Sequence, residues 1–203
     1  MSIGTLSGTI HLVRHGEVEN PAGIIYGRLP GYNLSKRGME QAEEAAEHLA
    51  DRDIGAVWSS PLERTRETAE VIARVHGHDV RIDERLIESG SEFQGVGRSI
   101  RAFMRSPRLW WSLRSPWRPS WGESFSEIRQ RMLEAVPDAL ADAGGREVVL
   151  VSHQTPVIVT RLALSERRLP PWISGVPCQT GSVTTIVLAD GKATGGSYFV
   201  PTA

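Results

Sequence analysis

Short apolar runs alternate along this chain with longer segments in which apolar residues recur at helical spacing. The runs are typical of buried strands, and the strongest of them extends from Glu147 to Ser152. The longer segments repeat apolar residues every three or four positions, as an amphipathic helix does. Strands that alternate with helices form a mainly parallel sheet with helices on both faces. The sequence therefore predicts an α/β protein, a three-layer sandwich.

The expected elements can be placed by residue number. The parallel strands are predicted at residues 9–13, 56–58, 80–82 and 147–152. The helices are predicted at residues 35–51, 62–75 and 123–142, with a last helix that has Pro156 in its first turn. The third of these helices contains Pro137, which it must tolerate or at which it kinks. Residues 182–200 hold two strand-like runs around Asp190-Gly191, so an antiparallel edge is expected.

Length and composition fit one globular domain over residues 1–203. Hydrophobic residues make up 40% of the chain, and no run is long enough to cross a bilayer. Residues 1–9 carry neither a basic stretch nor a long apolar block, so no secretory signal is expected. The one cysteine, Cys178, cannot form an intrachain disulfide. We therefore expect a cytoplasmic protein that does not contact the membrane.

Arginine and histidine side chains follow three of the predicted parallel strands. Arg14 and His15 come directly after the first strand, Arg64 lies at the start of the helix after the second, and His153 follows Glu147 to Ser152. The carboxyl ends of parallel strands meet at one edge, which is where α/β sheets bind ligands. Arginine binds phosphate or carboxylate through two parallel hydrogen bonds. The sequence therefore predicts an anion site at this edge.

A histidine in such a site can act as a base or as a nucleophile. Its neutral Nε2 can attack phosphorus if a backbone carbonyl binds the Nδ1–H and so fixes the tautomer. Gly16, directly after His15, allows a tight turn there. The simpler alternative is that each histidine merely ends a strand, but two histidines with two arginines on one edge favour catalysis.

These residues also stand in motifs that resemble the histidine phosphatase superfamily, the phosphoglycerate-mutase-like proteins, over most of the chain. Five motifs follow the order of the family: Arg14-His15-Gly16-Glu17, Leu34-Ser35 with Gly38, Gln41 and Ala42, Ser60 to Arg64 with Thr68, Gly122-Glu123-Ser124, and Val151-Ser152-His153. The resemblance implies a phosphohistidine on His15 and a phosphate held by Arg14, Arg64 and His153. It also implies a carboxylic acid that protonates the leaving oxygen.

The family carries this acid shortly after the third strand. Glu88 has the expected distance from Leu86, which makes it the predicted proton donor. The segment from Glu88 to Gly95 is one residue shorter than the family pattern, so Glu92 remains an alternative.

Three further residues are candidates for substrate contact. Asn20 stands one residue closer to the histidine than the corresponding asparagine of the mutases, and a turn residue before Pro21 is its alternative role. Arg28 is the second candidate. Gln154 is the third, and it stands where a Gly-Gly pair often follows the second histidine.

The stretch between the acid and the Gly122-Glu123-Ser124 motif is basic and aromatic. Residues 94–122 contain no acidic side chain, and they interleave six arginines with four tryptophans and Phe103. The family places a variable, substrate-determining insertion here, so we expect a lid-like insertion at about residues 96–121. The same composition suits single-stranded nucleic acid, or the buried face of a short helix with solvated arginines.

No metal or cofactor is expected. His11 and His15 are four residues apart and His76 and His78 are two apart, but no carboxylate or thiolate at a fitting spacing completes either pair. A formal net charge of −1 argues against a dedicated nucleic-acid-binding protein.

The predicted function is a metal-independent phosphomonoesterase that acts on a small phosphorylated metabolite. Phosphotransfer of the phosphoglycerate mutase type is the first alternative. A mutase generally needs a longer insertion and a closing C-terminal tail, whereas only three residues follow Val200 here. A non-catalytic phosphate-binding protein is the second alternative. Neither the identity of the substrate nor the oligomeric state follows from these residues.

Overall fold

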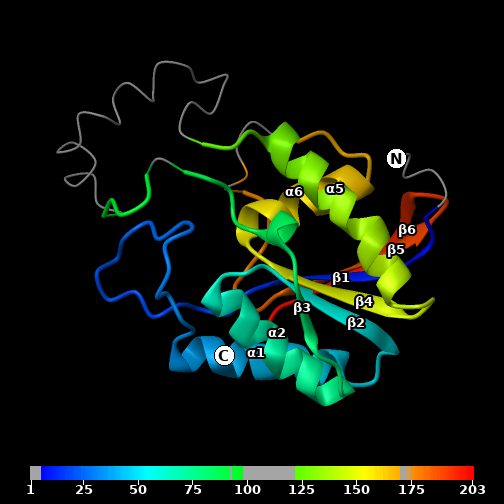
Figure 1. The fold of residues 1–203 in the computed structure, drawn as a ribbon, viewed down its shortest axis with the longest axis horizontal. Helices are drawn as coiled ribbons and strands as arrows, with labels where there is room; N and C mark the ends of the chain where they lie inside the picture. Colours follow the sequence, from blue (N-terminus) through cyan, green and yellow to red (C-terminus); the bar gives the residue numbers. More distant parts are fainter. Residues whose placement is uncertain (1–5, 92, 98–121, 170–172, 174) are drawn as a thin grey trace.

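The computed structural model describes residues 6–91, 93–97, 122–169, 173 and 175–203. A six-stranded sheet with the order β3-β2-β4-β1-β5-β6 forms the centre of these residues (Figure 1). The strands are β1 (Gly8–Arg14), β2 (Ile54–Ser59), β3 (Val80–Ile82), β4 (Glu147–Ser152), β5 (Val183–Ala189) and β6 (Lys192–Phe199). The first four in the order pair in parallel, and β5 and β6 form an antiparallel edge. The predicted sheet is confirmed.

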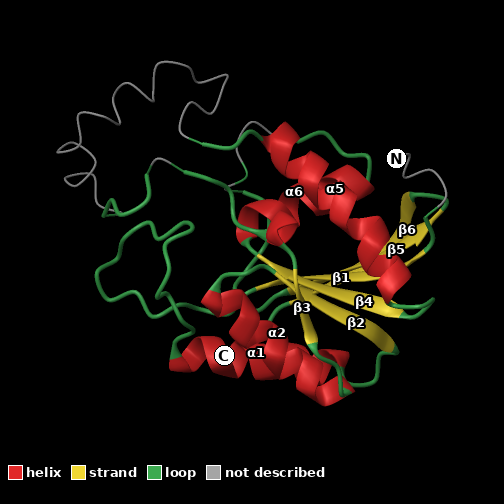
Figure 2. Ribbon diagram, viewed as in Figure 1, coloured by secondary structure: helices red, strands yellow, loops and turns green. Residues whose placement is uncertain are grey.

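Helices cover both faces of the sheet (Figure 2). The helices are α1 (Lys36–Leu49), α2 (Glu63–His76), α5 (Phe125–Asp142) and α6 (Gln154–Leu164), together with the short 3₁₀ helix η1 (Glu84–Leu86). The α1 and α2 pair packs on one face, and the α5 and α6 pair packs on the other. The described residues therefore form the predicted three-layer sandwich.

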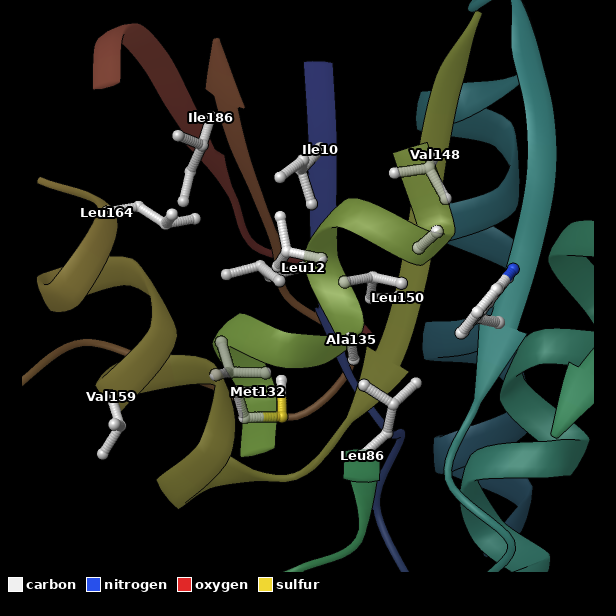
Figure 3. Close-up of a cluster of buried hydrophobic side chains, with 14 of the residues drawn as sticks. Ile10, Leu12, Leu86, Met132, Ala135, Val148, Leu150, Val159, Leu164 and Ile186 are labelled. Atoms are coloured by element: carbon white, nitrogen blue, oxygen red, sulfur yellow. The ribbon is translucent and has the colours of Figure 1, made fainter. Parts of the chain in front are cut away.

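Alternation along the central strands divides the core into two clusters. Ile10 and Leu12 of β1 face α5 and α6, whereas Val13 faces α1 and α2. Figure 3 shows part of the first cluster, which includes Leu12 of β1, Leu150 of β4 and Met132 of α5. Because successive side chains of a strand point to opposite faces, a strand that is buried on both faces is apolar throughout.

Local signals set the ends of the helices. The Ser35 hydroxyl accepts a hydrogen bond from the backbone N–H of Gly38 and so caps α1, as its sequence predicts. Ser124 and Glu127 form a capping box that starts α5 at Phe125, two residues after the predicted start. Gly77 ends α2 with a φ of 67°, a conformation that suits glycine.

The last helix begins earlier than the proline alone suggests. The α6 helix starts at Gln154, and Pro156 lies in its first turn. His153 is therefore the residue that caps this helix, directly after β4. Among the described residues, no helix is long and apolar enough to span a membrane.

The predicted lid-like insertion lies outside the described residues, except for its first positions. Val96 accepts a hydrogen bond from the backbone N–H of Ile25, and Gly97 forms a bridge with Ile24. These contacts dock the start of the insertion on the loop that follows β1. The interpretation of the arginines and tryptophans at residues 98–121 remains a prediction.

Candidate active site

The parallel pairing of β1 with β4 brings two histidines together. Arg14 lies opposite Ser152 in the register of these strands, so His15 and His153 follow at the same sheet edge. Their ring centroids are 5.1 Å apart, with an angle of 66° between the ring planes. Both side chains are buried. The predicted meeting of the two imidazoles is confirmed.

His15 is held as one neutral tautomer. Its Nδ1–H donates to the carbonyl of Gly16 at 2.7 Å, so the lone pair of Nε2 is left for another partner. Burial lowers the pKa of His15 well below its usual value, and the nearby Arg64 and Arg14 charges lower it further. The ring is therefore neutral at neutral pH, as a nucleophile requires.

Two arginines, the buried Arg64 and the partly buried Arg14, supply positive charge beside His15. Arg14 donates from Nη1 to the carbonyl of Cys178 at 2.6 Å. Arg64 is fully buried and donates from Nη2 to the carbonyl of Gly27 at 2.6 Å, with its guanidinium 4.8 Å from the ring centroid of Tyr26.

Several donors of these arginines are unpaired. Within the described residues, Nε and Nη1 of Arg64 and Nε of Arg14 are buried without a hydrogen-bond partner. A buried, unsatisfied N–H of a cation is costly, and a phosphate oxygen is a strong acceptor for it. The arrangement fits the predicted oxyanion site.

The second histidine is bound by a serine for which the sequence predicts no role. Nε2 of His153 lies 2.8 Å from the hydroxyl of Ser60, and both groups are buried. Burial lowers the pKa of His153 well below its usual value, and His15 and Arg64 lower it further. Ser60 opens the motif that contains Arg64, and that position was the only signal for its role.

Glu88 lies in the loop after η1 with its carboxylate fixed by the next residue. The backbone N–H of Ser89 donates to Oε1 of Glu88 at 2.8 Å, and the Ser89 hydroxyl donates to the same oxygen at 3.2 Å. Burial raises the pKa of Glu88, although Ser89, Arg64 and Arg14 oppose the shift. A raised pKa suits a proton donor. Glu92, the alternative, lies outside the described residues.

The three candidate substrate residues occupy different surroundings. The Asn20 side chain donates to the carbonyl of Ile24 at 2.9 Å and accepts from its N–H at 3.2 Å, so it closes a turn. It also lines a cavity of about 510 Å³ beside Arg14. Arg28 instead donates to the backbone carbonyl of Glu88, in the loop after η1, which we call the acid loop. Gln154 is the partly exposed first residue of α6. Substrate contact by these residues remains a prediction.

Two motif glycines hold the His15 loop against α1. A Cβ atom on Gly16 would lie 2.2 Å from the carbonyl oxygen of Gly38, and one on Gly38 would lie 1.9 Å from the carbonyl oxygen of Glu17. The backbone N–H of Gly16 donates to the hydroxyl of Thr68 at 3.2 Å. The sequence predicts a tight turn at Gly16, and the structure adds this close approach between two backbones.

The described residues contain no group of three or more histidine, cysteine, aspartate or glutamate side chains placed to hold a metal ion. His11 pairs with Thr185 at 3.0 Å and with Glu147 at 2.7 Å, on the side of β1 that faces α1 and α2. His11 and His15, considered as zinc ligands from the sequence, are four residues apart along an extended chain, roughly 13 Å at about 3.3 Å per residue. Each is also engaged with other partners.

A family model of the histidine phosphatase superfamily (branch 1) matches residues 10–198. The chain belongs to this superfamily. The resemblance inferred from the five motifs is thereby confirmed, and the matched range includes all the residues that surround the two histidines.

Proteins named as a phosphoglycerate mutase and as a phosphatase are both similar to this protein. An uncharacterized protein of Mycobacterium tuberculosis is 47% identical over 196 residues, which cover 96% of each chain. A 2,3-bisphosphoglycerate-dependent phosphoglycerate mutase of Thermoplasma acidophilum is 33% identical, over 72% of this chain and 70% of the mutase. The solved structure of a mycobacterial glucosyl-3-phosphoglycerate phosphatase is 29% identical with a TM-score of 0.72, over 97% of this chain and 99% of that one. This member of the superfamily therefore shares the fold of that phosphatase.

Proposed function

We propose that this protein is a phosphomonoesterase that hydrolyses a small phosphorylated metabolite through a phosphohistidine on His15. The observation that carries the proposal is the fixed tautomer of His15, whose Nδ1–H is bound to the Gly16 carbonyl beside two arginines with buried, unpaired donors. The solved relative acts, by its name, on glucosyl-3-phosphoglycerate, which supports a small metabolite as the substrate.

In the first step, Nε2 of His15 attacks phosphorus. The N–P bond forms as the bond from phosphorus to the leaving oxygen breaks, and Glu88 gives its proton to that oxygen. Arg14, Arg64 and His153 stabilise the charge on the other phosphate oxygens. The neutral state of His15 and the raised pKa of Glu88 both support this direction of proton transfer.

In the second step, water attacks the phosphorus of phosphohistidine. The N–P bond breaks and its electron pair returns to Nε2, while the Glu88 carboxylate takes the proton of the water. Inorganic phosphate leaves, and Glu88 is protonated again for the next turnover. These two reaction steps use side chains alone, so we propose that hydrolysis is metal-independent and that activity persists in the presence of a chelator. We also propose a cytoplasmic location, which suits the single, buried Cys178.

Phosphoglycerate-mutase-type transfer shares the first step and differs in the acceptor, a second hydroxyl in place of water. The 33% identical mutase favours this second candidate. A panel of metabolite phosphates separates the two, because a phosphatase releases inorganic phosphate from its substrate whereas a mutase returns an isomeric ester.

The test of the proposal compares the native protein with His15→Ala on this panel. We expect release of inorganic phosphate by the native protein and a loss of at least about a thousand-fold in the variant. Near-normal hydrolysis by His15→Ala would contradict the mechanism. Binding of phosphate with no turnover of any ester would favour the non-catalytic phosphate-binding protein.

A further inference from the structure

Arg28 joins three segments that are far apart in the sequence. Its Nε donates to the backbone carbonyl of Glu88 at 2.7 Å, and its Nη2 donates to Oε2 of Glu123 at 2.9 Å. Its backbone N–H donates to the side-chain oxygen of Gln94. The side chain that was a candidate for substrate contact is therefore engaged with the loop of the acid.

Glu123 is fixed from its other side by Arg131. Nε and Nη2 of Arg131 donate to the two oxygens of Glu123 at 2.6 and 3.0 Å, which is a bidentate pair. Both side chains are mostly buried, with 16% and 15% of their surface exposed. Nη1 of Arg131 also donates to the carbonyl of Arg85 at 2.5 Å. One carboxylate thus links the two arginines that bind the backbone carbonyls of Arg85 and Glu88.

The backbone around Glu123 is also joined to the acid loop. The N–H of Glu123 donates to the carbonyl of Gly90 at 3.1 Å, and Gly122 forms a bridge with Ser91. A Cβ atom on Gly122 would lie 1.8 Å from the carbonyl oxygen of Gly90, so only glycine fits there. Residues 85–91 are therefore held at both ends and at the acid itself.

We propose that Arg28 and Glu123 are positioning residues for the proton donor Glu88. Arg28 fixes the backbone carbonyl of Glu88 and Glu123 orients Arg28, so that the carboxylate is held at one distance from the leaving oxygen. This inference rests on the proposed function, in which Glu88 is the acid. A catalytic group displaced by about 1 Å can lose about a hundred-fold in rate.

The leaving group separates this role from a merely structural one. The leaving group of p-nitrophenyl phosphate, an aryl ester, is the weakly basic p-nitrophenolate, which needs little proton donation. The leaving group of glycerol phosphate, an alkyl ester, is a strongly basic alkoxide, which needs the acid. A variant with a misplaced acid therefore loses more activity on the alkyl ester, whereas a partly unfolded variant loses the same fraction on both.

The experiment measures kcat and KM on both esters for Arg28→Met and Glu123→Gln. The matched control is Arg81→Met, which breaks an exposed ion pair with Asp142 at 2.7 Å. We expect the loss of kcat on the alkyl ester to exceed the loss on the aryl ester by at least about ten-fold in both variants, with both KM values little changed. The control should keep the native ratio of kcat on the alkyl ester to kcat on the aryl ester. Glu123→Gln nearly preserves shape, so it answers the question if Arg28→Met does not fold.

Two reference variants separate failure of this inference from failure of the proposed function. Glu88→Gln should show the full selective loss, and Arg28→Met should add nothing to it in the double variant, because both act through one group. Equal losses on the two esters, or a rise in KM alone, would overturn the positioning role. Activity retained by His15→Ala, or no selective loss in Glu88→Gln, would instead overturn the proposed function itself.

Discussion

His15 and Glu88 have pKa shifts in opposite directions, and together they set the pH range of the proposed reaction. The pKa of His15 is lowered from 6.5, so the nucleophile stays neutral as the pH falls below that value. The pKa of Glu88 is raised from 4.5, so the acid stays protonated as the pH rises above that value. Both shifts are caused mainly by burial.

The pH dependence of kcat/KM should therefore be bell-shaped. Its acid limb is expected below 6.5, where His15 gains a proton, and its alkaline limb above 4.5, where Glu88 loses one. Steady-state rates from pH 4 to 9 check this expectation. An alkaline limb that persists unchanged in Glu88→Gln would show that another group, such as Glu92, donates the proton.

Arg64 offers a test of the oxyanion site by a single side chain. Arg64→Lys keeps a positive charge but loses the planar fork, and we expect kcat/KM to fall by about 10²–10³-fold. Arg66→Lys is the matched control, since Arg66 is exposed on the same helix and should keep native activity. Native kinetics in Arg64→Lys would show that these donors do not contact the reacting phosphate.

Ser60 should affect catalysis through its hydrogen bond to His153. Ser60→Ala leaves Nε2 of His153 buried without its partner, which costs about 1–3 kcal/mol, so kcat/KM should fall by about ten-fold or more. Ser59→Ala removes a buried hydroxyl that bonds to the Ser60 carbonyl at 2.9 Å and serves as the control. Equal kinetics in the two variants, measured beside their melting temperatures, would remove Ser60 from the site.

At the scale of single residues, the sequence predicts those site residues that stand in a motif or at the end of a strand. His15, His153 and Arg14 meet because they stand at the ends of β1 and β4. Arg64 joins them from the start of α2, which follows β2. The bond of Ser60 to His153 and that of Arg28 to Glu88 were not predictable. Each joins segments at least sixty residues apart, and no local spacing encodes such a contact.

At the scale of elements, the loop after β1 and the start of α1 are packed backbone against backbone. Alanine normally stabilises a helix relative to glycine by about 1 kcal/mol. Gly38→Ala should instead lower the melting temperature and the activity together, because its Cβ would lie 1.9 Å from the carbonyl of Glu17 in the His15 loop.

The control for this glycine is Gly195→Ala on β6, where a Cβ would meet nothing within 4 Å. Its melting temperature and its kinetics should both stay near the native values. A Gly38→Ala variant as stable and active as this control would show that the close approach does not hold the loop.

Element boundaries were predictable because their signals are local. The hydroxyl cap at Ser35, the glycine at position 77 and the turn at Asp190-Gly191 each act within a few residues. The α6 helix began two residues before Pro156 because a proline in the first turn does not mark its first position. The order of strands in the sheet depends on packing between distant segments, and the sequence predicted only its class.

At the scale of the molecule, stability and catalysis should respond to different residues. Leu150 is fully buried in the core between β4 and α5, so Leu150→Ala should cost about 2–5 kcal/mol in the free energy of unfolding. Val187 is 39% exposed, and Val187→Ala should cost about 0.5 kcal/mol or less. Urea unfolding checks both, and a cost for Leu150→Ala as small as that of Val187→Ala would contradict this description of the core.

The most direct test of the proposed mechanism is to capture the phosphoenzyme. The native protein is mixed with substrate, quenched in alkali, in which phosphohistidine is stable, and digested for mass spectrometry. We expect a phosphate on His15, in a peptide that is unlabelled in His15→Ala. A protein that hydrolyses its ester with the phosphate found on another side chain would contradict the phosphohistidine mechanism.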